Sequence, residues 1–150
     1  MAETGSTTKS YLPKGLPMPK PDPARRDEEF WAGLKRHELM VQYCKHCGTR
    51  QMEPECLCYN CQSFDLGWQK VAARGRIYSW IRPWYAAHPA LREFGPYIVV
   101  LVELDEDRSV RMAGNLLGDP HQEIRVGAPV EAVYEDHPDN GFTLVHWKTV

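Results

Sequence analysis

Five cysteines lie within residues 44–61, whose sequence is CKHCGTRQMEPECLCYNC, and the chain has no other cysteine. Four of them form two C-x-x-C pairs, Cys44 with Cys47 and Cys58 with Cys61, separated by ten residues. Each pair can form a knuckle, a tight turn that directs two thiolates toward one point, and two facing knuckles give the tetrahedral sulfur site that zinc prefers. The spacing therefore predicts a zinc ribbon with one ion bound by these four residues.

Four thiolates complete the coordination shell of zinc, so the pattern predicts a structural metal rather than a catalytic one. The fifth cysteine, Cys56, lies two residues from Cys58 and is badly placed to approach the same ion from another side. Gly48 follows the first pair, where the chain tends to need a positive φ as it leaves the knuckle, whereas Gln62 follows the second. A redox dithiol and an iron site are the alternative uses of these cysteines.

No catalytic motif accompanies the cysteines. The sequence shows no nucleophile within a motif, no glycine-rich phosphate loop and no pair of acids in an apolar segment. His88, His121 and His137 each adjoin a proline in loop-like sequence, which favours surface histidines over a catalytic base. We therefore expect a protein without an active site of its own.

A second group of residues has the composition of a binding surface. The segment WIRPWY, which begins at Trp80, is followed by Phe94 and Tyr97, and core packing at alternate positions does not account for Trp80, Trp84 and Tyr85 together. Aromatic residues combined with arginine are typical of interface hot spots, although solvated surface arginines are the alternative interpretation. The residues predicted to contact a partner are Arg74, Arg76, Arg82, Trp84, Tyr85, Arg92, Phe94 and Tyr97.

The elements that must position these residues follow from composition and periodicity. The 150 residues include five Trp, seven Tyr and four Phe, enough apolar area for a core. Residues 1–24 contain five prolines between positions 13 and 23, so we expect an extended tail that is either disordered or ordered against a partner. The segment DEEFWAGLKRHE at residues 27–38 predicts a helix of about three turns with Asp27 as its N-cap.

Alternating apolar residues predict β-strands in the rest of the chain. LMVQYC at residues 39–44 and FDLGWQKV at residues 64–71 predict two strands that flank the cysteine-rich loop. Further strands are expected at residues 71–82, 97–104, 109–117, 129–136 and 142–150, with a hairpin-turn signal at Asn140-Gly141. We therefore predict a mainly β fold, with a helix and zinc ribbon in residues 25–69 and a five-stranded OB-type barrel in residues 70–150.

Several segments occur in a characteristic order. FWAGL is followed by LMVQYCKHCG, a proline before the second C-x-x-C pair, RGRIYSW, PYIVVLVELD and VGAPVEAVYE. In this order they resemble the DUF35 family, acyl-CoA-associated proteins that join a rubredoxin-like zinc ribbon to an OB fold. The resemblance covers roughly residues 28–148. Such ribbons often carry a proline inside the second knuckle, where this chain has Tyr59, and Cys56 is additional.

The resemblance implies a non-catalytic accessory subunit in a hetero-oligomer with a thiolase-fold protein, whose chain would supply the nucleophilic cysteine. The complex would be an acyltransferase of a degradation pathway that cleaves a 3-oxoacyl-CoA with CoA, for example benzoylsuccinyl-CoA in toluene breakdown. A thiolase-fold side-chain aldolase is the alternative partner. On this interpretation the chain holds one structural Zn²⁺, and CoA or acyl-CoA is bound jointly with the partner. The arginine and aromatic residues named above would then contact the partner or the acyl-CoA.

Charge and hydropathy bear on two further expectations. A single-stranded nucleic-acid-binding protein is the second alternative, because zinc ribbons and OB barrels often have that role. The net charge is −2, with nine basic and nine acidic residues in residues 1–69 and nine against eleven in residues 70–150, which disfavours a polyanion site.

The sequence has no long apolar run and its first residues do not resemble a signal peptide, so we expect a cytoplasmic protein with reduced thiols.

Overall fold

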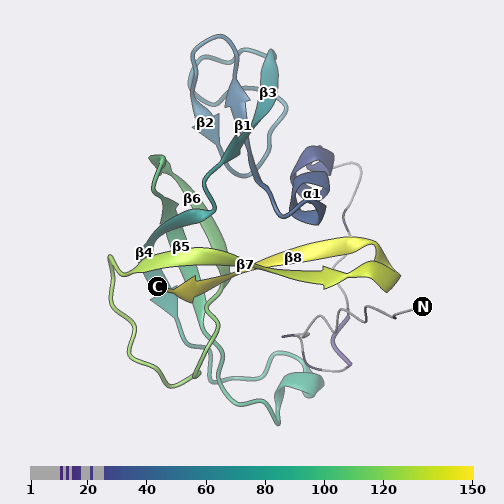
Figure 1. The fold of residues 1–150 in the computed structure, drawn as a ribbon, viewed down its shortest axis with the longest axis vertical. Helices are drawn as coiled ribbons and strands as arrows, with labels where there is room; N and C mark the ends of the chain where they lie inside the picture. The colour runs from purple at the N-terminus through teal and green to yellow at the C-terminus, as the bar shows by residue number, and fades with distance from the viewer. Residues whose placement is uncertain (1–10, 12, 14, 18–20, 22–25) are drawn as a thin grey trace, which may run out of the picture.

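The computed structural model describes residues 11, 13, 15–17, 21 and 26–150, so most of the predicted tail lies outside the described residues. One α-helix and two antiparallel sheets make up this part of the chain (Figure 1). The elements are α1 (Glu28–Lys35), β1 (Leu39–Cys44), β2 (Arg50–Gln51), β3 (Leu66–Val71), β4 (Arg74–Ile81), β5 (Val99–Leu104), β6 (Asp107–Asn115), β7 (Pro129–His137) and β8 (Phe142–Thr149), with short 3₁₀ helices η2 (Pro89–Leu91) and η3 (Pro138–Asn140). The predicted mainly β fold with an N-terminal helix is confirmed.

Helix α1 begins after Asp27, as predicted, but ends at Lys35 and is shorter than three turns. Asp27 makes no side-chain capping hydrogen bond, so the acidic first turn is what interacts favourably with the helix dipole. The chain leaves the helix where His37 adopts a left-handed conformation with φ of 56°. Gly33 is buried at the point where α1 meets β1, and a Cβ at Gly33 would collide with the side chain of Met40. This close approach joins the helix to the ribbon.

The ribbon sheet has the strand order β2-β1-β3, with β1 antiparallel to both neighbours. The alternation in LMVQYC is typical of a half-buried strand, but Met40 and Gln42 are buried together with Leu39 and Val41. Met40 is covered by α1, and Gln42 is covered by the loop between the knuckles, where it bonds the backbone of Glu55. Strand β2 was not predicted because two residues are too few for a periodic pattern.

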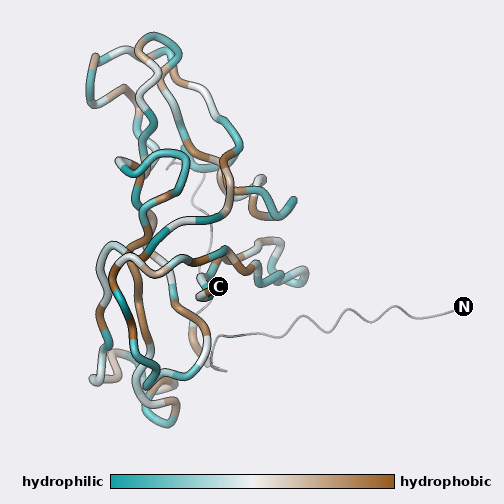
Figure 2. Tube along the Cα trace, turned by 60° about the vertical axis from the view of Figure 1, so that its left-hand side comes forward, coloured by the Kyte–Doolittle hydropathy of each residue, from teal (hydrophilic) through white to brown (hydrophobic). Residues whose placement is uncertain are grey.

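The five-stranded sheet has the order β6-β5-β4-β7-β8 and curls until its two edge strands meet. A parallel bridge between Leu116 and Trp147 joins the end of β6 to β8, which gives an OB-like barrel. Trp147 is fully buried, and Gly114 leaves the space that its indole occupies. Hydrophobic residues recur along the barrel strands, whereas hydrophobic and hydrophilic residues are mixed in the loops at the far end of the ribbon (Figure 2).

The ribbon and the barrel follow each other with little intervening chain. Strand β3 continues to Val71, which still pairs with β1, so β4 begins at Arg74 and later than expected. Between them, the N–H of Ala72 donates to Glu106 Oε1, with a nitrogen–oxygen distance of 2.6 Å, and Glu106 lies in the turn before β6. Arg50 of β2 donates to the carbonyl of Glu106 at 3.4 Å. The ribbon is thereby tied to the β5–β6 end of the barrel. No helix in the described part of the chain is long and apolar enough to cross a membrane.

Candidate metal centre and partner surface

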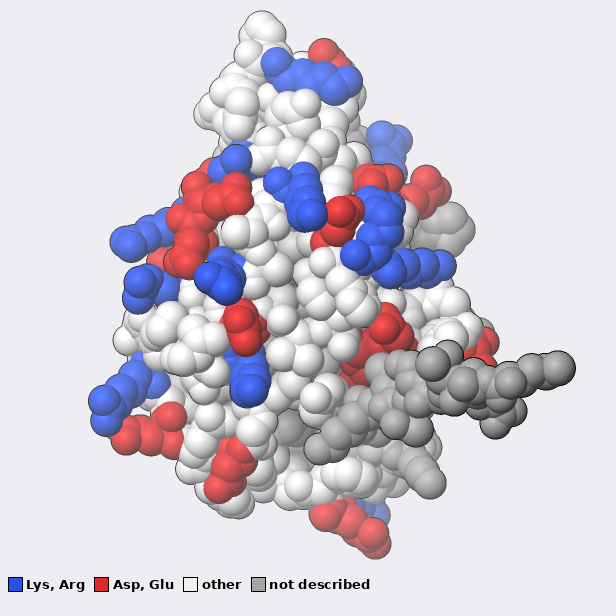
Figure 3. All heavy atoms as spheres, viewed as in Figure 1, with Lys and Arg blue, Asp and Glu red and all other residues white. Residues whose placement is uncertain are grey.

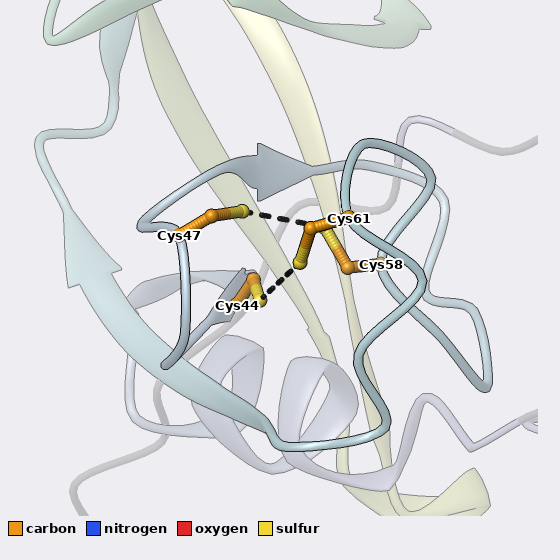
Figure 4. A group of neighbouring side chains, drawn as sticks. All are labelled: Cys44, Cys47, Cys58 and Cys61. Atoms are coloured by element: carbon orange, nitrogen blue, oxygen red, sulfur yellow. Dashed lines mark hydrogen bonds between the residues drawn. The ribbon is translucent and has the colours of Figure 1, made fainter.

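The four cysteines of the two C-x-x-C pairs converge although they come from different loops (Figure 4). Cys44 ends β1 and Cys47 lies in the following turn, whereas Cys58 and Cys61 belong to the connection between β2 and β3. Their sulfur atoms all lie within 4.8 Å of one another. Cys56 is exposed and is not a member of this group. The structure thus brings together the four residues predicted from the spacing and leaves the fifth aside.

The two knuckles have matching backbone geometry. The N–H of Gly48 donates to the carbonyl of Cys44 at 2.8 Å, and the N–H of Gln62 donates to the carbonyl of Cys58 at 2.9 Å. Gly48 and Gln62 both have left-handed backbone, with φ of 76° and 61°. The expected positive φ at Gly48 is confirmed, and Gln62 adopts the same conformation at the cost of a crowded Cβ.

The sulfur separations fit a zinc ion. The Cys44 and Cys61 sulfurs are 3.5 Å apart, and the Cys47 and Cys58 sulfurs are 3.7 Å apart. A tetrahedron with Zn–S bonds of about 2.3 Å has sulfur–sulfur edges of about 3.8 Å. Four sulfur ligands would fill the coordination shell, so the site can hold a metal but offers no open position for a substrate.

The protonation equilibria of the thiols also indicate a site for a cation. A hydrogen bond to the Thr49 hydroxyl lowers the pKa of Cys47 to about 6. A backbone hydrogen bond at Ser63 lowers the pKa of Cys61, but burial and the neighbouring thiols outweigh it and raise the pKa to about 12. Neighbouring thiolates repel one another, so they cannot all ionise without a compensating positive charge. A divalent cation would supply that charge.

A buried pair of glutamines, which the sequence analysis missed, supports the second knuckle. Gln51 Nε2 donates to Gln42 Oε1 at 2.6 Å and to the carbonyl of Leu57 at 3.2 Å. Gln42 in turn accepts the N–H of Glu55 and donates to its carbonyl, each at 3.0 Å. Side chains on β1 and β2 therefore hold the loop that leads to Cys58.

The arginines predicted to bind a partner do not form one cluster. Arg74 and Arg76 lie at the start of β4 beside the ribbon, whereas Arg82 follows the other end of that strand, and an eight-residue strand is about 25 Å long. Arg82 is only partly exposed, and its guanidinium donates to the carbonyl of Gln122 at 2.6 Å. Arg92 is exposed just after η2. Arg74 and Arg76 thus lie at the ribbon end of the barrel, whereas Arg82 bonds a carbonyl within the chain.

The aromatic candidates lie at the end of the barrel opposite the ribbon. Trp84, Tyr85 and Phe94 are 70%, 85% and 60% exposed. Trp80, by contrast, packs partly against the core, which is the role expected of alternate strand positions. Tyr97 is partly buried in the connection that leads to β5. Among the three exposed side chains, the Trp84 ring lies 5.6 Å from that of His121.

An apolar cavity of about 410 Å³ lies beside Phe94, one of the three exposed aromatic residues. Phe94 and Tyr97 line it from one side, and the residues that follow β6 line it from the other. Tyr11 and Leu16 of the N-terminal segment form a third wall. Two of the predicted contact residues therefore share a cavity that the other candidates do not line.

The prediction of a surface histidine is wrong for His137. Its side chain is 11% exposed, and its Nε2 lies 2.9 Å from Oε1 of the fully buried Glu135. His146 Nε2 lies 2.6 Å from the other oxygen of this carboxylate. Strand β7 extends as far as His137, which keeps the side chain within the sheet instead of in a loop. His121 is exposed as expected, and His88 is partly buried, where it caps η2.

Comparisons with known proteins agree with this architecture. The model of the ChsH2 rubredoxin-like zinc ribbon domain matches residues 31–67, and that of the ChsH2 C-terminal OB-fold domain matches residues 68–135. The 3-oxo-4,17-pregnadiene-20-carboxyl-CoA hydratase alpha subunit of Mycobacterium tuberculosis is 31% identical over 134 residues, which cover 87% of this chain but 40% of that protein. A DUF35 domain-containing scaffold protein of Methanocaldococcus jannaschii is 26% identical over 116 residues, covering 74% of this chain and 78% of that protein.

Solved structures extend the comparison. A structure described as an Ltp2-ChsH2(DUF35) aldolase has a TM-score of 0.71 and 30% sequence identity, and the match covers 89% of this chain and 98% of that chain. A DUF35 protein of unknown function from Sulfolobus solfataricus has a TM-score of 0.57 at 15% identity, which shows the fold alone. Fold and site together define a protein that fuses a rubredoxin-like zinc ribbon to an OB barrel. The chain belongs to the DUF35 family, in its ChsH2-like form.

Proposed function

We propose that this chain is the non-catalytic, zinc-binding accessory subunit of a complex whose thiolase-fold partner carries out the chemistry on a CoA thioester. One observation carries the proposal: the chain matches 98% of the DUF35 chain in a structure described as an Ltp2-ChsH2(DUF35) aldolase, at 30% identity. The described residues also offer a closed sulfur site and no second group of three metal-ligating side chains. In this proposal the nucleophilic cysteine belongs to the partner.

Two partner activities are compatible with this role. The first is thiolytic cleavage of a 3-oxoacyl-CoA, including an aromatic one such as benzoylsuccinyl-CoA, and the second is side-chain cleavage by an aldolase. The description of the solved relative as an aldolase favours the second. The chain spans 40% of the mycobacterial hydratase subunit, so the hydratase activity named for that protein is not transferred to this chain.

The zinc ion has a structural role in this proposal. Cys44, Cys47, Cys58 and Cys61 would hold it as thiolates, and the bound ion would supply the charge and cross-link that the short ribbon strands lack. The ribbon in turn contacts α1 through β1 and the barrel through Glu106. A folded ribbon therefore keeps the helix and barrel in the arrangement that a partner recognises.

The partner surface is assigned to the end of the barrel opposite the ribbon. Its support is the exposure of Trp84, Tyr85 and Phe94, since large exposed aromatic side chains are typical of interface anchors. The cavity beside Phe94 and Tyr97 is of a size and polarity that suit an apolar acyl group bound jointly with the partner. Arg92, which is exposed on the same segment, is the arginine best placed to meet CoA phosphates or partner acids.

A single-stranded nucleic-acid-binding role has less support. Lysine and arginine residues are interleaved with acidic residues on the face shown in Figure 3, without a continuous basic stripe on that face. Binding to single strands requires a groove of positive charge that follows the backbone. Titration of a labelled oligonucleotide at several salt concentrations tests this alternative: submicromolar binding with a steep salt dependence would favour it over the accessory-subunit proposal.

Co-expression with the protein encoded by the neighbouring open reading frame, followed by size-exclusion chromatography, tests the proposal. We expect a thiolase-like neighbour that co-elutes with this chain. Trp84→Ala and Tyr85→Ala should each weaken co-elution, whereas Phe64→Ala, which changes a residue 76% exposed on the ribbon, serves as the matched control. A neighbour that is not thiolase-like, or two proteins that elute separately, would refute the proposed function.

A further inference from the structure

The N-terminal segment is attached to the barrel through a buried carboxylate. The backbone N–H of Tyr11 donates to Glu135 Oε1, and the two atoms are 3.0 Å apart although they belong to residues 124 positions apart. The ring of Tyr11 lies edge-on to the imidazole of His146, with 5.6 Å between the ring centroids. Tyr11 therefore contacts both β7 and β8 at one point.

Glu135 is an unusual residue to find at such a point. Its side chain is fully buried, and burial of a carboxylate is costly unless hydrogen bonds and positive charge compensate it. His146 Nε2 hydrogen-bonds one of its oxygens at 2.6 Å, the Tyr11 N–H donates to the other, and His137 Nε2 lies 2.9 Å from that second oxygen without hydrogen-bond geometry. The N-terminal segment is therefore attached in two ways: the backbone N–H of Tyr11 bonds Glu135, and the tyrosine ring packs against His146.

From this anchor the segment continues toward the loop that carries the exposed aromatic residues. The N–H of Leu16 donates to the carbonyl of Pro13 at 3.3 Å, which turns the chain. A Cβ at Gly15 would lie 3.7 Å from the Ala90 side chain, so the turn rests on η2. Leu16 also shares one cavity with Phe94 and a second, of about 460 Å³, with His88. Gly15 and Leu16 thus lie next to residues 88–98, Gly15 beside Ala90 and Leu16 in the walls of two shared cavities.

We propose that residues 11, 13 and 15–17 belong to a strap that crosses the barrel from Glu135 to η2 and holds residues 84–97 in the conformation presented to the partner. The part of this inference that concerns the partner rests on the proposed function, whereas the strap itself is a property of the isolated chain. The sequence left open whether the proline-rich tail orders against a partner. The structure instead places Tyr11, Gly15 and Leu16 of that tail against the chain's own barrel.

Hydrogen exchange of the isolated, zinc-loaded protein tests the strap with two variants at one position. Tyr11→Pro removes the backbone N–H that Glu135 accepts, and Tyr11→Ala retains this N–H but removes the ring beside His146. For Tyr11→Pro we expect exchange of residues 88–98 to become about tenfold faster, with a smaller increase for Tyr11→Ala. Unchanged exchange in β7 and β8 shows that the barrel remains folded. Equal exchange of residues 88–98 in the wild type and Tyr11→Pro would overturn the inference.

Affinity for the co-expressed partner supplies the second measurement. Weaker binding of Tyr11→Pro, with binding of Tyr11→Ala between it and the wild type, supports presentation of residues 84–97 by the strap. Faster exchange without any loss of affinity would overturn that presentation. If the wild-type chain binds no partner, the proposed function fails, while the exchange measurement on the isolated chain still decides whether the strap exists.

Discussion

Replacement of Gln42 with leucine tests how the two zinc knuckles are held together. Gln42 is 4% exposed and makes three hydrogen bonds, one with the Gln51 amide and two with the backbone of Glu55. Leucine has a similar volume but can make none of them. With a net contribution of about 1 kcal/mol per hydrogen bond, the loop before Cys58 should lose about 3 kcal/mol of local stability. Local opening of the ribbon should then become about a hundredfold more frequent.

Zinc transfer to a chromophoric chelator measures this opening, because the metal leaves a closed four-sulfur site through local unfolding. We expect release from Gln42→Leu to be up to about a hundredfold faster than from the wild type. Glu55→Ala is the matched control, since its side chain is exposed and its backbone bonds to Gln42 remain. Equal release rates for Gln42→Leu and Glu55→Ala would refute the assignment of the glutamine pair to knuckle support.

Three further predictions concern the metal, the pH dependence and the barrel. Cys58→Ser should abolish zinc binding, whereas Cys56→Ser should retain one zinc per chain by elemental analysis; loss of metal from the latter would mean that a different set of four binds it. A hydrogen bond from His37 lowers the pKa of Asp136 in the folded protein. The ionised carboxylate therefore stabilises the fold fully above the pKa of an unfolded aspartate, about 4, and this stabilisation is lost as the pH falls through the lower pKa of the folded state. Asp136→Asn should therefore lower the free energy of unfolding in urea at pH 7 by less than about 1 kcal/mol, given 38% side-chain exposure, and the difference should shrink as the pH falls below the pKa of an unfolded aspartate. Gly75→Ala should cost about 2–4 kcal/mol in the same assay, because its Cβ would collide with a carbonyl oxygen of β5; an unchanged midpoint would contradict that packing.

Local patterns were sufficient to predict the helix and every strand except β2. Alternating apolar residues predicted β1, β3 and all five barrel strands, and the cysteine spacing predicted which four thiols converge. The ends of these elements were less predictable. Helix α1 stops at Lys35 because the backbone turns away at His37, and β4 starts only at Arg74 because β3 still pairs with β1 as far as Val71. Strand β2 was not predicted, because its two residues form a strand only through their pairing with β1.

The buried polar clusters were missed for a different reason. Glu135 lies on the face of β7 opposite Ala132 and Tyr134, which pack against the core, so alternation predicts that it is exposed. Its burial results from His146, 11 positions away on the neighbouring strand, and from Tyr11, 124 positions away. Gln42 is likewise covered by a loop that returns to β1. The periodicity of a single strand gives no information about which other segments of the chain cover its outer face.

The sequence by itself determined the class of this protein: its order of helix, ribbon and barrel and the four cysteines whose sulfurs converge, because these depend on spacing and periodicity over short stretches. Only the tertiary structure decided which of the predicted contact residues lie together. It separated Arg74 and Arg76 from the aromatic residues by the length of β4, turned Arg82 inward, and placed Tyr11 on Glu135. Side-chain direction and the pairing of distant segments decide such proximities, and neither is encoded in any single short stretch of the chain.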